Sequence, residues 1–321
     1  MDILGEVLLS LRLLANSIGI FDFAAPWGFF MPAVSPAFAC SLTVLDGPCW
    51  FESEDRPGIF LEPGDSILIL NGAAHRYTSS PNVSEPRSLL DYLTRLGWGE
   101  FGPDTKRTGP IKVCWGEGEN RTRLLTLAFI VQEPAHSPLL AALPPTILLK
   151  KSADTVFPWV PAALSFLAAE ETSAMPGFVA TATRLAELIF TSFLRAHVIT
   201  APTTSASWMR GLYDPRIGKA LANIHGQPEM PWTAEMLARE AGMGRSTFAR
   251  RFTELVGQSP IDYLIAHRMQ LACERLIGNK DSIAAIAEHL GYQSERAFRH
   301  AFKTRFGMAP TQYAKAQKER I

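Results

Sequence analysis

The C-terminal third of the chain contains an internal repeat, and this feature constrains the fold most. Five positions recur 50 residues later: Phe248, Phe252, Gly257, Pro260 and Tyr263 return as Phe298, Phe302, Gly307, Pro310 and Tyr313. Ala238 and Gly242 return 49 residues later as Ala287 and Gly291. Two copies are too few for a solenoid, which needs at least about three repeats to bury a continuous core. The chain therefore carries one duplicated unit.

Each copy predicts a helix, a tight turn and a second helix. The alanine lets the two helices approach closely, and the glycine that follows permits a left-handed backbone at the end of the first helix. The phenylalanine pair then buries one face of the second helix, because residues four apart lie on the same side. This order is the pattern of a helix-turn-helix. Asp214, Thr233 and Ser282 are expected to cap helix starts in the same region.

The face of each second helix that lies opposite the phenylalanines is polar and basic. At about 100° per residue it carries Ser246, Arg250 and Thr253 in the first copy, and Arg296, His300 and Lys303 in the second. Arginine can bond to guanine in the major groove, and lysine can neutralise phosphate. Any helical hairpin has a charged outer face, but two hairpins with the same core pattern and basic outer faces favour DNA binding.

At these residues the chain resembles the AraC/XylS family of bacterial transcription regulators. The resemblance rests on Ile283, Ile286, Ala287, Gly291, Tyr292, Ser294, Phe298, Phe302, Lys303, Gly307, Pro310 and Tyr313, with Leu237, Ala238, Gly242, Met243, Phe248 and Phe252 upstream. It implies two helix-turn-helix units joined by one long helix, roughly 260–277, which places two recognition helices in successive major grooves. Gly244 departs from the family, which usually has a serine cap there.

The resemblance also implies the partners of the chain. These are a double-stranded DNA operator, a small-molecule effector, RNA polymerase and a second copy of the chain in a homodimer. The predicted DNA-contacting residues are Arg245, Ser246, Ala249, Arg250, Thr253, Glu295, Arg296, Arg299, His300 and Lys303.

Charge divides the chain in the same way. Residues 214–321 carry 16 Lys and Arg against 11 Asp and Glu, a net charge of +5, which leaves −5 for residues 1–213 because the whole chain is neutral. A basic module on an acidic chain is consistent with a polyanionic partner, although +5 is also compatible with an ordinary solvated surface.

The N-terminal half predicts a β-sandwich or barrel. Short apolar runs at 40–45, 49–51, 66–70, 111–115 and 124–131 are separated by glycine and proline. A glycine-rich stretch from Gly97 to Pro110 is expected to be a mobile loop. Two amphipathic helices follow, at 158–171 and 181–197, which either pack on the sheet or form a dimer interface. Residues 200–207 are rich in Thr, Ser, Ala and Pro, as linkers are.

This half resembles the cupin-type sensing domain of some AraC-type regulators. The stretch from Pro63-Gly64-Asp65 to Asn71-Gly72-Ala73-Ala74-His75 is similar to the second cupin motif, whose histidine often binds a metal. The expected fold class is α+β: a cupin-like β-barrel with two following helices, then an all-α domain of two helix-turn-helix units. The expected boundaries are 1–199 for effector binding and dimerisation, 200–213 for the linker and 214–321 for DNA binding.

The chain is not expected to be an enzyme or to need a metal or other cofactor. A cupin metal site needs about three converging ligands, and no histidine precedes His75 in the chain. A small organic effector is therefore expected, with pocket candidates Trp27, Trp50, Phe51, His75 and Trp115.

Three other functions compete with that of an effector-responsive regulator. The first is a metal- or redox-sensing regulator that uses His75 and cysteines, although Cys49 and Cys114 are expected to be buried, inert thiols. The second is a cupin enzyme with a DNA-binding appendage. The third is an architectural DNA protein without a ligand, for which some 190 residues of barrel-like sequence are more than is needed.

The chain is expected to be cytoplasmic. Its longest uninterrupted apolar run, 124–131, has eight residues, whereas a membrane-spanning helix needs roughly 20. Acidic residues stand near the N-terminus where a secretory signal would carry Lys or Arg. Four scattered cysteines do not make a disulfide framework.

Overall fold

The computed structural model describes residues 4–5, 8, 11, 13–83, 85–98, 110–131, 140, 143–151, 158–169, 176–200, 211, 214–278 and 281–318. The chain divides into two compact units, which are described separately below. The sheet-rich unit comprises residues 12–134 and 143–201, and the helical unit comprises residues 1–11, 135–142 and 202–321.

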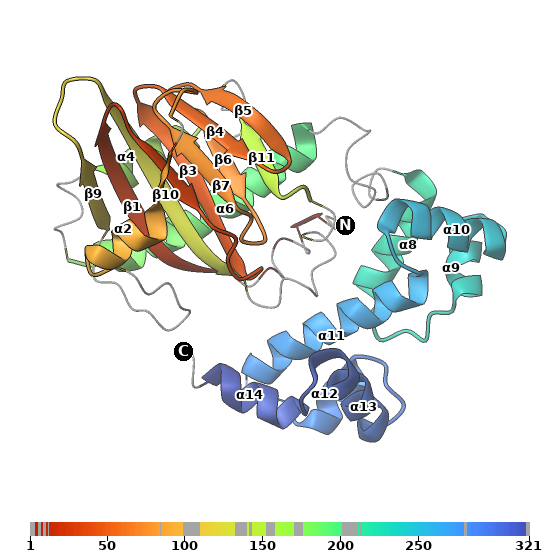
Figure 1. The fold of residues 1–321 in the computed structure, drawn as a ribbon. Helices are drawn as coiled ribbons and strands as arrows, with labels where there is room; N and C mark the ends of the chain where they lie inside the picture. The colour runs from red at the N-terminus through yellow and green to blue at the C-terminus, as the bar shows by residue number, and fades with distance from the viewer. Residues whose placement is uncertain are drawn as a thin grey trace. The chain divides into compact units, whose positions relative to one another are not determined.

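The sheet-rich unit consists of two facing β-sheets (Figure 1). The larger sheet has the order β11-β6-β3-β10-β1-β9. Its strands are β1 (Leu13–Ala24), β3 (Phe38–Asp46), β6 (Ser66–Ile69), β9 (Ile111–Trp115), β10 (Arg121–Val131) and β11 (Thr146–Leu149). All neighbouring strands are antiparallel except β1 and β9, which are parallel.

The smaller sheet has the order β5-β4-β7-β2-β8. Its strands are β2 (Gly28–Met31), β4 (Cys49–Ser53), β5 (Arg56–Leu61), β7 (His75–Thr78) and β8 (Arg87–Ser88). A short helix, α2 (Leu89–Arg95), follows β8 directly and is capped by the Ser88 hydroxyl, which accepts from the backbone N–H of Asp91. Leu89 and Leu93 of this helix are buried in the core between the sheets.

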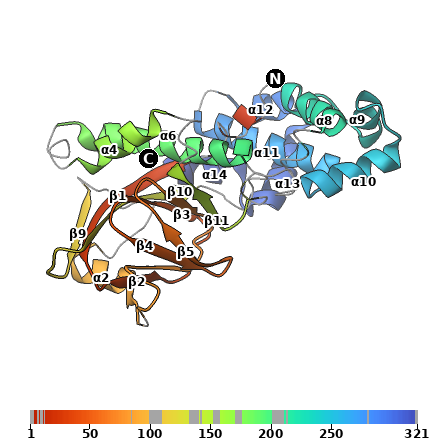
Figure 2. The same ribbon diagram turned by 90° about the horizontal axis from the view of Figure 1, so that it is seen from above.

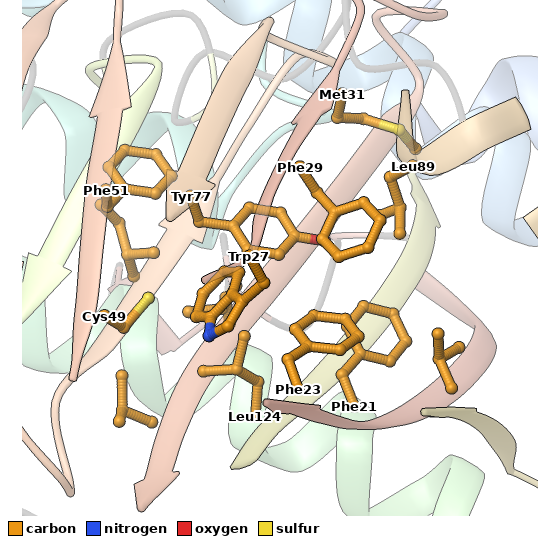
Figure 3. Close-up of a cluster of buried hydrophobic side chains, with 14 of the residues drawn as sticks. Phe21, Phe23, Trp27, Phe29, Met31, Cys49, Phe51, Tyr77, Leu89 and Leu124 are labelled. Carbon is orange, nitrogen blue, oxygen red and sulfur yellow. The ribbon is translucent and has the colours of Figure 1, made fainter. Parts of the chain in front are cut away.

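That core is rich in aromatic side chains. Phe23, Trp27, Phe29, Phe51 and Tyr77 are each at most 2 % exposed and come from both sheets or the turn beside them (Figure 3). The rings of Phe23, Trp27, Phe29 and Tyr77 contact one another at tilted or edge-on angles, with centroids 4.7 Å apart for Phe23 and Phe29. Such contacts add to the free energy gained by burying the apolar rings.

Two helices, α4 (Val160–Ala168) and α6 (Phe178–Thr200), cover the outer face of the larger sheet (Figure 2). Phe190 of α6 packs against Phe129 of β10 with the rings tilted and their centroids 4.8 Å apart. The backbone N–H of Ala15 on β1 also donates to Oε1 of Glu187 on α6. Of the two alternatives expected from the sequence, packing on the sheet is observed, and the dimer interface stays a prediction.

The helical unit contains two similar halves joined by the long helix α11 (Pro260–Gly278), as Figure 1 shows. The first half comprises α8 (Pro215–Gly226), α9 (Ala234–Glu240) and α10 (Arg245–Val256). The second comprises α12 (Ile283–His289), α13 (Glu295–Phe306) and α14 (Pro310–Lys318). Asp214, Thr233 and Ser282 cap α8, α9 and α12 as predicted, each with its side chain accepting from backbone N–H groups.

The α+β fold class and the duplicated helix-turn-helix are thus confirmed. The five apolar runs of the N-terminal half all form strands, but these runs do not include β1, β2, β5, β7, β8 or β11. The linker predicted at 200–213 and the mobile loop predicted between Gly97 and Pro110 fall almost entirely outside the described residues.

Candidate functional site: two recognition helices and an interior cavity

The second helix of each half, α10 and α13, buries its phenylalanines and leaves the opposite face in solvent. Phe248 and Phe252 are completely buried in the first half, and Phe298 and Phe302 are completely buried in the second. Each pair has similar ring geometry, with centroids 5.6 Å apart in α10 and 5.7 Å apart in α13. The repeat therefore reproduces the same packing twice, and it fixes which face of each helix points outward.

The predicted DNA-contacting residues lie on these outward faces. Arg245, Ser246, Arg250, Thr253, Arg296, His300 and Lys303 are exposed, whereas Ala249, Glu295 and Arg299 are partly buried. The ten positions form five pairs that are 50 residues apart, so the two helices present equivalent positions, although the two residues differ in every pair.

Two arginines on these faces have a carboxylate one helical turn away. Arg299 donates from Nε to Oε1 of Glu295 at 2.6 Å. Arg250 lies farther from its partner, with 3.8 Å between its Nε and Oε1 of Glu254, and both side chains are mostly exposed. A contact of this kind at the surface contributes little stability, so it leaves Arg250 available to another acceptor.

The helix starts differ between the two copies. Ser294 caps α13 with its hydroxyl, which accepts from the backbone N–H of Ala297 at 3.2 Å. Gly244 occupies the same position before α10 and has no side chain to accept a hydrogen bond. Its departure from the family pattern does not prevent α10 from forming, in agreement with the small cost of glycine at a cap.

The sheet-rich unit contains a small interior cavity of ≈ 50 Å³. It lies between the two sheets and is lined by apolar side chains that include Phe21, Met31, Leu42, Leu89 and Leu93. His75, Tyr77, Cys40 and Thr126 are polar residues of its lining. None of the residues that line it carries a side chain that is charged at neutral pH, because burial lowers the pKa of His75.

Polar groups in the cavity are unequally satisfied. Nδ1 of His75 donates to the carbonyl oxygen of Ala73 at 2.9 Å, which leaves Nε2 of the neutral ring as an acceptor. The Tyr77 hydroxyl is buried and has no hydrogen-bond partner among the described residues. Such a group costs free energy unless a partner is supplied.

The five predicted pocket residues lie in different places. His75 lines the cavity, whereas Trp27 and Phe51 are packed in the core beside it (Figure 3). Trp27 donates from its indole N–H to the Thr122 hydroxyl at 3.2 Å. Trp115 packs edge-on against Phe29 and Tyr92 at the rim of the core.

Trp50 points away from the cavity. Its neighbours Cys49 and Phe51 are buried between the sheets, so the alternation of the strand directs Trp50 to the outer face. There it contacts Phe60, with ring centroids 5.3 Å apart, and Phe60 is 41 % exposed.

A larger hollow of ≈ 280 Å³ lies between the larger sheet and the helices α4 and α6. Leu149, Leu164 and Phe193 contribute apolar lining. The hydroxyls of Thr43 and Ser66 in its lining bond to each other at 2.8 Å. These two polar groups are therefore satisfied without a ligand, in contrast to Tyr77.

The cysteines differ in accessibility, which corrects one prediction. Burial raises the pKa of the Cys40 thiol to about 12 and that of Cys49 further still, so both remain protonated. Cys114 was expected to be buried but is exposed. Ile111 and Val113 of the same strand point inward, so strand alternation places Cys114 outward.

Neither a metal site nor a membrane span is found in the described part of the chain. No group of three or more His, Cys, Asp or Glu side chains there could hold a metal ion. No helix of the described residues is long and apolar enough to cross a membrane. The absence of a catalytic activity stays a prediction.

The sequence did not identify most of the cavity lining. Met31, Phe38, Leu89 and Leu93 were not singled out, because contacts between two sheets and a short helix are distant in sequence. Strand alternation through Leu42 and Val44 would have indicated which side chains of β3 face the interior.

Comparisons with protein families match both parts of the chain. A family model described as "Cupin" matches residues 2–199, and one described as "Helix-turn-helix domain" matches residues 237–316. Together they span most of the sheet-rich unit and the helical unit from within α9 to α14.

Curated relatives match over most of the chain. The HTH-type transcriptional regulator AlkR of Acinetobacter baylyi is 31 % identical over 288 residues, which cover 89 % of this chain and 90 % of the relative. A putative AraC-like transcription regulator of Streptomyces lividans is 37 % identical over 280 residues, or 85 % of each chain. Among solved structures, the DNA-binding domain of AdpA in complex with a target DNA is 33 % identical and covers 33 % of this chain and 96 % of that one, with a TM-score of 0.31.

Proposed function

Because the chain belongs to the AraC-type family of DNA-binding transcriptional regulators, we propose that α10 and α13 are its recognition helices and that a small molecule in the sheet-rich unit controls them. The observation that carries this assignment is the repeated exposed face, which the same buried phenylalanine pair orients in both copies. We assign residues 1–199 to effector binding and dimerisation, 200–213 to the linker and 214–321 to DNA binding.

Within each recognition helix the residues have different roles. Arg250 and Arg296 are exposed cations on long side chains, suited to bidentate contacts with guanine in the major groove. Lys303 supplies a flexible ammonium group suited to a phosphate. Arg245, Ser246, Ala249, Thr253, Glu295, Arg299 and His300 complete the two interfaces.

The interior cavity is the proposed effector site. A buried tyrosine hydroxyl without a partner among the described residues and the acceptor Nε2 of the neutral His75 ring can bind a group that both accepts and donates a hydrogen bond. The apolar, uncharged lining fits a small neutral molecule with one such group, for example an alcohol or a phenol. At ≈ 50 Å³ the cavity holds little more than a water molecule or two, so a larger effector must displace side chains of the lining.

Three further assignments belong to this proposal. The chain acts on operator DNA in the cytoplasm, contacts RNA polymerase and forms a homodimer through the helices α4 and α6. It performs no catalysis and needs no metal. The alternative of a thiol sensor finds little support at Cys40 and Cys49, because burial keeps both thiols protonated.

The test is genomic binding of the tagged full-length chain, with and without small neutral alcohols and phenols in the medium. A reproducible set of bound sites that shares one sequence motif, and whose occupancy changes with one compound, is the expected result. The variant Tyr77→Phe should bind sites with the same sequence motif, but its occupancy of those sites should change less with the compound. Binding without a common motif would contradict recognition, and an unchanged response in Tyr77→Phe would contradict the cavity assignment.

A further inference from the structure

A buried arginine on the long helix α11 connects the two halves of the helical unit. Arg268 is 8 % exposed. Its Nε donates to the carbonyl oxygen of Pro228 at 2.6 Å, and its Nη2 donates to that of Met230 at 2.8 Å. Both acceptors belong to the turn between α8 and α9, in the first half. A guanidinium group is suited to two simultaneous, directional bonds of this kind.

The same guanidinium group also reaches the second half. It lies over the ring of Tyr292, with 5.7 Å between the guanidinium carbon and the ring centroid. The preceding residue, Gly291, has a left-handed backbone with φ of 71°. A Cβ at this position would overlap the carbonyl oxygen of Glu229 and lie 2.8 Å from Nη2 of Arg268. The turn of the first half is therefore in direct contact with the turn of the second.

These contacts form what we call the Arg268 clasp: Arg268, the turn 228–230 and the turn formed by Gly291 and Tyr292. The turn 228–230 is itself held by local bonds, from the N–H of Met230 to the carbonyl of Gln227 and from the indole N–H of Trp232 to the same carbonyl. Each of the two turns precedes one recognition helix or the helix packed against it. The clasp therefore joins two segments whose positions determine where α10 and α13 lie.

We propose that Arg268 is a positioning residue for DNA recognition. By holding the two halves together, the clasp fixes the distance and rotation between α10 and α13. It therefore determines the spacing, in base pairs, that the chain requires between the two DNA segments that these helices contact. Two grooves on one side of DNA are about 34 Å apart, and one additional base pair rotates one element by roughly 34° relative to the other. A rigid pair of helices cannot follow that rotation, whereas a loosened pair can.

The repeat supplies a matched control for this proposal. Gly242 stands at the equivalent position of the first copy, with φ of 63°, but a Cβ there would meet nothing within 4 Å among the described residues. Gly242→Ala and Gly291→Ala thus introduce the same kind of backbone strain, and only Gly291→Ala pushes the two halves apart. Arg268→Lys removes the two-bond geometry while it keeps the charge, and Arg275→Lys is its control on the same helix, where Arg275 pairs with Asp281 instead.

The experiment measures the affinity of the full-length chain for three duplexes. The first duplex is enriched from a random-sequence library by the wild-type chain. The other two carry the same sequence with one base pair inserted or removed between the two DNA segments that α10 and α13 contact. Wild type, Gly242→Ala and Arg275→Lys should bind the altered duplexes about tenfold more weakly than the first, since DNA must be twisted to fit. Gly291→Ala and Arg268→Lys should bind all three within about threefold of one another, since a loosened pair of helices needs less of that twist.

Two outcomes would overturn the clasp. One is wild-type discrimination between spacings in both Gly291→Ala and Arg268→Lys, and the other is an equal loss of discrimination in Gly242→Ala. Thermal melting identifies a variant that does not fold. If Gly291→Ala does not fold, the comparison of Arg268→Lys with Arg275→Lys tests the proposal. The inference rests on the proposed recognition helices, but their failure is distinguishable, because the wild-type chain would then enrich no common sequence.

Discussion

The imidazole rings of His225 on α8 and His267 on α11 lie in contact, with their centroids 4.1 Å apart. Nε2 of His225 lies 2.8 Å from the Tyr263 hydroxyl, whereas Nε2 of His267 has no hydrogen-bond partner among the described residues. Burial lowers the pKa of His225 to about 4. Burial, with smaller contributions from His225 and Arg268, lowers that of His267 to about 3. Both rings are therefore neutral in the folded chain at pH 7.

This pair predicts that acid destabilises the helical unit from about pH 6.5 down to about pH 3, the folded pKa of His267. An unfolded histidine has a pKa of about 6.5, so below that pH the unfolded chain binds protons that the folded chain does not. The free energy of unfolding then falls by up to about 1.4 kcal/mol per pH unit for each ring. Above pH 6.5 both states are neutral, and the pair has no pH effect.

Hydrogen exchange of the α8 and α11 amides, corrected for the intrinsic pH dependence of exchange, measures this stability. In His267→Leu the slope between pH 6.5 and 5 should be smaller than in the wild type. His289→Gln is the control, because His289 is exposed on α12 and should leave the slope unchanged. An unaltered slope in His267→Leu would assign the acid sensitivity to other groups.

The cavity predicts an increase in stability on removal of a hydroxyl. Because the Tyr77 hydroxyl is buried without a partner among the described residues, Tyr77→Phe should raise the free energy of unfolding by about 1–2 kcal/mol. Tyr92→Phe is the matched control and should instead lower the free energy of unfolding, since the Tyr92 hydroxyl donates to the carbonyl of Cys114 at 2.9 Å. Denaturant unfolding of the two variants, compared with the wild type, checks this. A loss of stability in Tyr77→Phe would show that a bound molecule satisfies the hydroxyl.

The helical unit was predictable from sequence because its signals are local. Phe248 and Phe252 are one turn apart, so they define the buried face of α10 without reference to any other element. The caps at Asp214 and Ser282 likewise act within three residues. The role of Arg268 was not visible, because its acceptors at 228 and 230 lie some 40 residues away.

The effector cavity was less predictable from the sequence. Locating a strand in the sequence does not tell which of its alternating side chains face the core. Cys49, Trp50 and Phe51 are all apolar, so the pattern does not indicate which of them points inward. Their pairing with β5 and β7 settles this by placing Cys49 and Phe51 inside and Trp50 outside. For β9 the alternation of Ile111, Lys112 and Val113 did show which side chains face inward, and it would have indicated an exposed Cys114.

The helix α6 predicts a dimer interface. Leu188 and Ile199 are 51 % and 48 % exposed, and they lie eleven residues apart, which places them on the same outward face of the helix. A second copy would cover this face. Sedimentation of the full-length chain at tens of micromolar should show a dimer, and Leu188→Arg should shift it toward monomer. Leu96→Arg, at an exposed leucine directly after α2, is the control. A wild-type monomer at that concentration would exclude the interface.

The two exposed arginines of the recognition helices predict a loss of specific binding. Arg250→Ala and Arg296→Ala should each weaken binding to the enriched duplex by about 1–3 kcal/mol and relax the sequence preference at one position, as removal of a base contact does. Competition binding against single-base variants of the duplex measures both effects. Lys219→Ala, whose ammonium group lies 3.8 Å from Glu240, should bind as the wild type does. Wild-type affinity in both arginine variants would mean that the outward faces are assigned wrongly.

Lys303 predicts a different signature, because a phosphate contact carries no base information. Lys303 is exposed on α13, 50 residues after Thr253 of α10. Lys303→Ala should weaken binding to the enriched duplex and to unrelated DNA by a similar factor. It should also reduce the slope of log affinity against log salt concentration by about 1, since one fewer counterion is released. Titrations at several salt concentrations with both DNAs measure the slope. A selective loss on the enriched duplex with an unchanged slope would instead make Lys303 a base-reading residue.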